Sequence, residues 1–383
     1  MFTCRRIVQS ISLPVTGAML SACLYSIAIA AMFAPGSAHA LSCGTHAKGV
    51  CSGERNQYAG GFNPQTGFGG FGGGNCVASR TPVIFIHGNG DNANSWDAPP
   101  GTVTGFAPAP HSVYDEMKAR GYNDCELFGV TYLSEDERKP QNAGKNYHQP
   151  AKYRIIRDFI KAVKTYTGQS KVDIVAHSLG VTQSLAAVRK YKLGNSVRKF
   201  VNIGGGLRGL YSCYQTGFAS SVAPTCNSQN LFNGDVFGFF PEGFAGVIWV
   251  PNKWTGSGSS RSLRLAPKYR TTTQFYTISA SSKDEVICSS TAFRSDCNQS
   301  SRFEDAQNVK AQINVGAGKD AAQVDLDWSD YSPFNLLGGD SSGGVGHFRS
   351  KDNTGSIIQR MLQTDCAGLD CAADYSYGPK VLY

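Results

Sequence analysis

The chain has 383 residues, of which 41% are apolar and 17% charged, so it holds enough apolar side chains for a buried core and is not disordered by composition. Its 44 glycines and 16 prolines indicate a loop-rich protein rather than a helical bundle or a coiled coil. The formal net charge is +8, but the lysines and arginines are scattered along the chain. We therefore expect no nucleic-acid partner, because such proteins usually gather their positive charge in a patch.

The first 40 residues have the features of an export signal. Arg5 and Arg6 precede an apolar stretch over 17–33, and Ala38-His39-Ala40 matches the small-x-small pattern of a cleavage site. A lipoprotein is the alternative, because small residues precede Cys23, but the chain stays apolar beyond that cysteine. We expect cleavage at Ala40/Leu41 and a secreted monomer. No later apolar run reaches the ~20 residues of a membrane span.

Ten cysteines remain once residues 1–40 are removed, an even number that favours disulfide bonds in an oxidising compartment. Neither a CxxC nor an HExxH pattern occurs, so we expect no metal and no cofactor. Proximity along the chain is the only argument for the pairing. It gives Cys43 with Cys51, Cys213 with Cys226, Cys288 with Cys297 and Cys366 with Cys371, and it leaves Cys76 for Cys125.

The secondary structure begins with a glycine-rich arm over 41–80. Its segment 58–75 (YAGGFNPQTGFGGFGGGN) has neither helical nor strand periodicity, and we expect an irregular arm on the surface. Short apolar, β-branched runs then predict strands at Pro82–Ile86, Cys125–Thr131, Val172–Ala176, Val197–Ile203, Thr273–Ser279 and Lys310–Val315. Helical patterns lie at His111–Arg120, Lys152–Tyr166, Leu179–Tyr191 and Gly355–Leu362.

This alternation of strands and helices predicts an α/β protein. Parallel neighbours need a crossover, which a helix supplies, so we expect a mainly parallel sheet of about six strands with helices on both faces. Residues 41–383 would form a single catalytic domain. The alternation breaks over about 204–270, an aromatic-rich insertion that we interpret as a lid or binding surface. A satellite core under a disulfide-tied loop is the alternative.

The segment VDIVAHSLG predicts a nucleophile elbow at Ser178. A buried strand ends in a small-x-Ser-x-Gly turn that leads directly into a helix. Ala176 replaces the more common glycine before the serine, and a methyl group is still small. This strand, turn and helix point to the α/β-hydrolase fold with Ser178 as the nucleophile.

A serine nucleophile needs a histidine base and a carboxylate that orients it. In this fold the chain order is Ser, acid, His, and His347 is the only histidine beyond the elbow. The acid should follow the second strand after the elbow's own, where the loop SASSKDEVIC offers Asp284. Its neighbour Glu285 is the alternative, and Asp340 is a more distant one.

Two backbone N–H groups are candidates for an oxyanion hole. The first predicted strand ends in an HGNG turn, where the N–H of Asn89 is one donor, and the N–H of Leu179 after the nucleophile is the other. His87 is interpreted as shaping this turn.

Three further motifs are weaker. GGGLRG at 204–209 matches a dinucleotide-binding pattern, but no helix follows it. GAGK at 316–319 lacks the spacing of a phosphate-binding loop. GDSSG at 339–343 follows no predicted strand, so Ser341 is interpreted as a turn residue.

The chain resembles the extracellular polyhydroxybutyrate depolymerases of the lipase-like kind, which act on native amorphous polymer. The resemblance runs through residues 41–383 and rests on YAGGF, GGFGGG, TPVIFIHGNGDN, RGYNDCELFGVTY, VDIVAHSLG, RGLYSCY, FGFFPEG, WTGSGS, VKAQINVGAG, GVGHFR and GLDCAA. It implies a triad of Ser178, Asp284 and His347 with oxyanion donors at Asn89 and Leu179. It also implies a hydrophobic polyester as substrate, bound by exposed aromatic residues at the positions of Tyr147, Tyr214, Phe232 and Trp249.

The chain departs from the family where paired tyrosines are expected, because it has Tyr214-Gln215 and Leu231-Phe232. These departures leave the chemistry intact and bear on polymer affinity. Two other functions stay open. A triacylglycerol lipase or general carboxylesterase would use the same triad, and a non-catalytic polymer-binding protein would have kept the scaffold alone.

Overall fold

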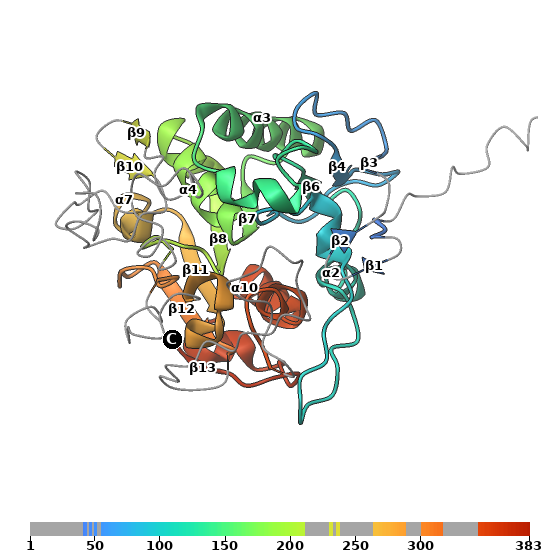
Figure 1. Ribbon diagram of the computed structural model, residues 1–383. Coiled ribbons are helices and arrows are strands. Elements are labelled where there is room, and N and C mark those ends of the chain that lie inside the picture. The colour runs from blue at the N-terminus through green and yellow to red at the C-terminus, as the bar shows by residue number, and fades with distance from the viewer. Residues whose placement is uncertain are drawn as a thin grey trace, which may run out of the picture. The chain divides into compact units, whose positions relative to one another are not determined.

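A nine-stranded mixed sheet organises the described part of the chain (Figure 1). The computed structural model divides into two units, Met1–Ala38 and His39–Tyr383, and only the second is described here, by itself. The described residues are 41–43, 46–47, 50–51, 55–210, 230–232, 235–237, 263–288, 300–316 and 344–383. The expected export signal lies outside them.

The strand order is β13-β12-β11-β8-β7-β5-β6-β4-β3. The six strands from β12 to β6 are parallel, whereas β13 and β4 pair antiparallel with their inner neighbours and β3 runs parallel to β4. The bounds are β3 Asn56–Tyr58, β4 Gly70–Gly72, β5 Val83–Ile86, β6 Leu127–Val130, β7 Val172–His177, β8 Val197–Ile203, β11 Gln274–Ser279, β12 Val309–Asn314 and β13 Val381–Leu382.

The six predicted strands are the six parallel strands, with ends that differ by at most two residues at each end. Strands covered on both faces consist of continuous apolar runs, and every residue of β5, β6 and β7 is buried. The α/β prediction is therefore confirmed. Two small hairpins stand apart from the sheet: β1 (His46–Ala47) with β2 (Val50–Cys51), and β9 (Asn230–Phe232) with β10 (Asp235–Phe237).

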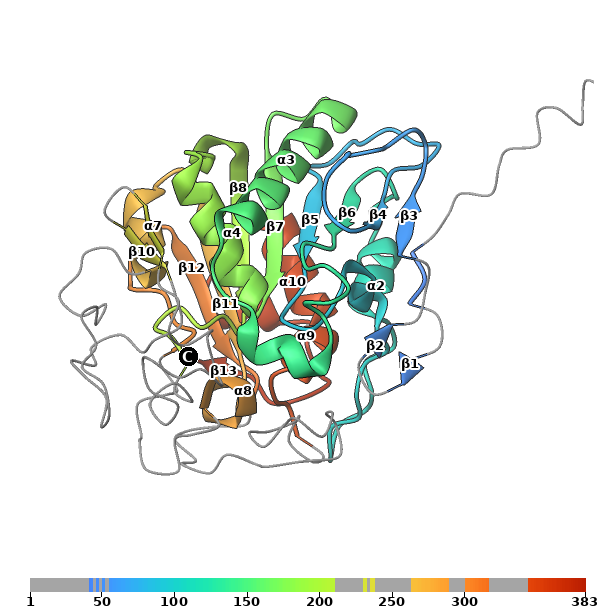
Figure 2. The same cartoon turned by 45° about the horizontal axis from the view of Figure 1, so that its top comes forward.

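Helices cover both faces of the sheet (Figures 1 and 2). On one face α3 (Pro150–Thr167) and α4 (Leu179–Lys190) pack together, and on the other α2 (Val113–Ala119) packs against α10 (Gly355–Gln363). The shorter helices are α7 Ala266–Tyr269, α8 Glu285–Cys288 and α9 Arg349–Asp352. The 3-10 turns are η1 Ala93–Asp97, η2 Pro140–Lys145, η3 Gly194–Ser196, η4 Leu263–Leu265, η5 Ser281–Lys283 and η7 Gly368–Ala372. Across the described residues we find no helix that combines the length and apolar character needed to cross a membrane.

The glycine-rich segment 58–75 is not an irregular surface arm, and that prediction is wrong. Tyr58 is the last residue of β3, Gly70–Gly72 form β4, and β4 joins the main sheet beside β6. Phe62 and Phe71 are buried in the two cores, one on each face of the sheet. Glycine is needed opposite Phe71, because a Cβ at Gly129 of β6 would lie 2.2 Å from the Phe71 ring.

Two of the expected disulfides are present, Cys76–Cys125 and Cys366–Cys371. The first confirms the pair that proximity supported least. Cys43 is also disulfide-bonded. The other pairings involve cysteines whose side chains lie outside the described residues: Cys51, Cys213, Cys226, Cys288 and Cys297.

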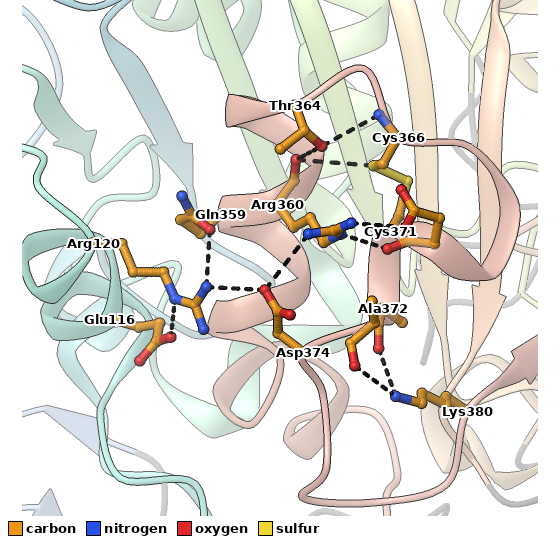
Figure 3. A network of polar contacts seen from close by, with 12 residues as sticks. Glu116, Arg120, Gln359, Arg360, Thr364, Cys366, Cys371, Ala372, Asp374 and Lys380 are labelled. Carbon is orange, nitrogen blue, oxygen red and sulfur yellow. Dashed lines mark hydrogen bonds and ion pairs between the residues drawn. A yellow bond between two sulfur atoms is a disulfide. The ribbon is translucent and has the colours of Figure 1, made fainter.

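The C-terminal segment is fastened to α10 and α2 by a polar network (Figure 3). Arg360 of α10 donates to Asp370 Oδ1 (2.7 Å), and Arg120 at the end of α2 donates to Asp374 Oδ2 (3.2 Å). Lys380 Nζ donates to the carbonyl of Ala372 (2.7 Å). The disulfide Cys366–Cys371 lies within the same network, so the chain end is held to the fold at several points.

Candidate active site

Ser178 lies in the tight turn between β7 and α4. Its φ of 52° and ψ of −125° are rarely adopted by residues with a side chain, and strain of this kind gathers at functional sites. The Ser178 N–H donates to the carbonyl of Ile203 at the end of β8 (2.9 Å). The AHSLG pattern thus predicted this strand, turn and helix correctly.

Two glycines let the end of β5 approach this turn. A Cβ at Gly180 would lie 2.3 Å from the carbonyl oxygen of His87, and one at Gly88 would lie 3.1 Å from Ser178 Cβ. The Gly180 distance is too short for any side chain, and a Cβ at Gly88 would also lie only 2.9 Å from Nδ1 of the buried His177 ring. The HGNG turn after β5 is therefore packed directly against the serine.

The predicted oxyanion donors flank Ser178 from these two turns. Leu179 is the first residue of α4, so its N–H has no acceptor within the helix. Among the described hydrogen bonds, the N–H groups of Asn89 and Leu179 donate to no protein acceptor. The Asn89 side chain is held on both sides, because its Nδ2 donates to the Ala143 carbonyl (2.9 Å) and its Oδ1 accepts from Asn146 Nδ2 (2.6 Å). The sequence carries no local signal for these contacts of the Asn89 side chain, because Ala143 and Asn146 lie more than 50 residues away along the chain.

Asp284 and His347 meet as a buried pair. The Nδ1 of His347 lies 2.9 Å from each carboxylate oxygen, and both residues are 1% exposed. Asp284 Oδ1 also accepts from the N–H groups of Val286 (3.2 Å) and Ile287 (2.9 Å) at the start of α8. These two backbone donors hold the Asp284 carboxylate in place against His347 Nδ1.

Gly204 connects the serine turn with this pair. It follows Ile203, which accepts the Ser178 N–H, and its own N–H donates to Ile278 (3.0 Å). A Cβ there would lie 3.2 Å from Asp284 Oδ2 and 3.3 Å from the His347 ring, and φ is +56°. The glycine motif at 204–209 therefore serves close packing behind the pair, and its residues 207–208 form a turn.

His177 ties the elbow to His347 in a second way. Its Nε2 lies 3.0 Å from the His347 carbonyl oxygen, and the two rings are 4.6 Å apart between centroids. Burial, and then the neighbouring His347, lower the pKa of His177 well below its usual value, so the ring is neutral. Within the described residues no hydrogen bond joins Ser178 Oγ to the His347 ring. Such bonds often tighten only once substrate is bound.

His87 shapes the turn after β5, as expected. Its Nδ1 lies 2.7 Å from the Gly88 carbonyl oxygen and its Nε2 accepts from the Tyr132 N–H (3.2 Å). The ring stacks on Tyr132 at 4.4 Å, and burial lowers the pKa of His87 to about 4. A neutral, fully bonded ring leaves no free nitrogen to act as a base.

Of the four aromatic residues expected to bind substrate, only Tyr147 has a described side chain. It is half-buried, follows Asn146, whose Nδ2 donates to Asn89, and has Lys152 Nζ 5.7 Å from its ring centroid. Tyr214 and Trp249 lie outside the described residues, and of Phe232 only the backbone, in β9, is described. Tyr147 is thus placed beside the candidate oxyanion turn.

The sheet order, the strained serine turn and the buried Asp–His pair fit the α/β-hydrolase fold. The family model for class 2 lipases matches residues 80–324, and the chain belongs to this family. The matched range contains Ser178 and Asp284 and ends before His347.

Solved structures give more distant likenesses. Lipase B of Aspergillus fumigatus is 14% identical over 76% of this chain and 54% of its own, with a TM-score of 0.37. The mature form of Bacillus licheniformis lipase BlEst2 is 14% identical over 76% of this chain and 95% of its own, with a TM-score of 0.35. This chain thus spans about half the length of the Aspergillus lipase.

Proposed function

We propose that this chain is a secreted serine esterase that cleaves amorphous poly(3-hydroxybutyrate) and releases 3-hydroxybutyrate oligomers. The observation that carries ester hydrolysis is the buried Asp284–His347 pair, connected through Gly204 and His177 to the strained Ser178 turn. Disulfides in the chain support export, because such bonds persist in oxidising compartments.

In the first half-reaction Ser178 Oγ attacks the carbonyl carbon of an in-chain ester. His347 Nε2 takes the hydroxyl proton, and Asp284 stabilises the imidazolium that forms. The negative charge on the former carbonyl oxygen faces the N–H groups of Asn89 and Leu179. When the tetrahedral intermediate collapses, His347 returns the proton to the leaving alkoxide, which departs as a hydroxyl-ended chain, and an acyl-enzyme remains.

Water completes the cycle. His347 removes a proton from the water as it attacks the acyl-enzyme, and a second tetrahedral intermediate uses the same two N–H groups. Its collapse returns the proton to Ser178 and frees the carboxylic acid. The strained turn and the anchored Asn89 keep these groups in place before substrate arrives, so little reorganisation accompanies the reaction.

The polyester as substrate is supported by the sequence segments shared with polyhydroxybutyrate depolymerases, such as RGLYSCY, FGFFPEG and GVGHFR. Membership of the class 2 lipase family supports ester hydrolysis and fits a triacylglycerol lipase or carboxylesterase equally well. A non-catalytic polymer-binding protein would have no use for a nucleophile, a base and an acid kept together.

Clearing of native polymer granules, measured beside hydrolysis of tributyrin, separates these functions. The proposal expects granule clearing by the wild-type chain and none by Ser178→Ala. Tributyrin hydrolysis without granule clearing would assign the chain to the lipases. Neither activity, with adsorption to granules retained, would favour the binding protein.

A further inference from the structure

An uncharged loop over 98–111 (APPGTVTGFAPAPH), here called the apolar loop, connects η1 with α2. Between Asp97 and Asp115 the sequence contains no Asp, Glu, Lys or Arg. The residues at its tip, 104–108, are all exposed, and Phe106 shows 41% of its surface to solvent. The loop projects from the fold below α2 in both views (Figures 1 and 2).

The base of the apolar loop is fixed although its tip is exposed. Val103 is 3% exposed and belongs to the core, and its carbonyl accepts the Phe106 N–H (3.0 Å) in a turn with Gly105 at φ +83°. Ser112 Oγ donates to Asp97 Oδ1 (2.8 Å), which joins the two ends of the loop. Four prolines in the loop restrict it further. Exposure of apolar residues to water is unfavourable, and yet these contacts keep the tip of the loop exposed.

The apolar loop is attached to the helix that follows His347. The Gly101 N–H donates to Asn353 Oδ1 (2.9 Å), and Asn353 Nδ2 donates to the Gly101 carbonyl (2.7 Å). Asn353 ends α9, which begins two residues after His347. At its other end the loop continues from η1, which follows the Asn89 turn. The loop is therefore held between the two segments that carry the candidate base and oxyanion donor.

We infer that the apolar loop is a docking surface for the insoluble polyester, which it holds at the mouth of the active site with Phe106 as its contact. This rests on the proposed function. The polyester surface has no charge and few strong hydrogen-bond donors, so adsorption must come from apolar contact. An uncharged, pre-formed apolar tip matches that chemistry and loses little conformational entropy on binding.

Two other occupants fit less well. A stable dimer buries roughly 800 Å² on each partner, far more than the exposed tip at 104–108 offers. Segments that bind anionic membranes combine apolar residues with lysines and arginines, and the apolar loop has neither. The polyester is the occupant that the composition of the loop favours.

Adsorption is measured in a Ser178→Ala chain, which binds without hydrolysing, by depletion of protein from suspensions of amorphous polymer granules. Phe106→Ser is compared with Val77→Ser. Val77 is 82% exposed, and it follows Cys76 ahead of β5, near the opposite end of the parallel strands. Phe106→Ser should lower the granule partition coefficient roughly five- to tenfold, the scale of losing part of one phenylalanine contact. Val77→Ser should stay within about twofold.

A second arm uses the chain with Ser178 intact. Phe106→Ser should lower the ratio of granule hydrolysis to p-nitrophenyl butyrate hydrolysis by the same factor, at an unchanged melting temperature. Equal adsorption with and without Phe106 would overturn the inference, and so would an equal loss in Val77→Ser. If Phe106→Ser lowered only the hydrolysis of tributyrin emulsions, the loop would be a lipid-binding surface. If it changed only the sedimentation of the protein, the loop would bind a second copy of the chain. Either result would overturn the inference. Phe106-dependent adsorption by a chain that does not hydrolyse the polymer would overturn the proposed function and support the docking surface.

Discussion

Lys351 and Asp91 form a buried ion pair between α9, which follows the candidate base, and the turn that follows the candidate oxyanion donor. Lys351 Nζ lies 3.5 Å from Asp91 Oδ2, and the side chains are 2% and 9% exposed. The same ammonium donates to the carbonyl and Oγ of Ser95 (3.1 Å each) and contacts Asp352 Oδ1 at 3.1 Å. Burial alone would lower the pKa of Lys351, but Asp352 and Asp91 outweigh it, and the pKa lies above its usual value. Lys351 is therefore charged at neutral pH.

Lys351→Met should destabilise the fold by about 3–5 kcal/mol, because it leaves the Asp91 carboxylate buried without its cation. Urea unfolding measures this change. Lys139→Met is the control: its partner Asp136 is 75% exposed, and the loss should stay below about 1 kcal/mol. The double variant Asp91→Asn/Lys351→Met should lose less than the sum of the two single variants. Additive losses would mean that the pair is not coupled.

Ser178→Ala, Asp284→Asn and His347→Ala should each lower kcat for a soluble ester by roughly 10⁴-fold. Ser178→Ala should leave the melting temperature close to that of the wild type. His347→Ala should lower it, because the Asp284 carboxylate then stays 1% exposed without its partner. Glu285→Gln is the control for the acid. If Asp284→Asn kept full activity and Glu285→Gln lost it, the acid of the triad would be Glu285 instead of Asp284.

Stability should decline as the pH falls from about 6.5 towards 4. Burial lowers the pKa of His87 to about 4, whereas in the unfolded chain it is near 6.5. Between these values the unfolded state binds a proton that the folded state does not, so the free energy of unfolding decreases by up to roughly 3 kcal/mol. His177, whose pKa is also lowered, adds to the decline.

Urea unfolding at pH 7.5, 5.5 and 4.5 measures this slope. The slope of the unfolding free energy against pH reports how many protons the chain takes up on unfolding. In His87→Gln this number should be smaller by about one, whatever the stability of the variant at pH 7.5. An identical slope in both proteins would mean that His87 titrates normally in the fold.

Removal of the Cys76–Cys125 disulfide should destabilise the fold more than removal of Cys366–Cys371. The cysteines are 49 residues apart in the first disulfide and 5 residues apart in the second. Because a longer closed loop restricts the unfolded chain more, we expect losses of about 4 and about 2 kcal/mol, respectively. Paired Cys→Ser variants and urea unfolding test the order. Thiol titration of the denatured, unreduced wild type should find no free thiol. The reverse order of losses would show that contacts of the C-terminal network, rather than loop closure, dominate.

The aromatic residues predicted to bind substrate should affect polymer hydrolysis more than soluble-ester hydrolysis. Tyr147→Ala, Phe232→Ala and Trp249→Ala remove apolar contact area that an insoluble ester needs. The ratio of granule to p-nitrophenyl ester hydrolysis should fall several-fold in each variant. A parallel loss of both activities with a lower melting temperature would instead identify the ring as part of a core.

The sequence predicted the six central strands because strands buried on both faces must be continuous apolar runs. It missed β3 and β4, since glycine has no strand preference and no side chain to give a period. Their place in the sheet depends on Phe71 fitting over Gly129, 58 residues further along the chain. Such complementarity between distant segments is a property of the packed sheet.

Within the site, the sequence by itself determined the serine, since a strand, a tight turn and a helix in succession fix Ser178 locally. It narrowed the candidate base to His347 by chain order. Tertiary structure alone decided that Asp284 meets His347 across 63 residues, that His177 holds the His347 carbonyl, and that Lys351 reaches Asp91 across 260 residues. These contacts form only when the sheet order brings the strand ends together, and a hydrogen bond between distant segments leaves no periodic pattern in the sequence.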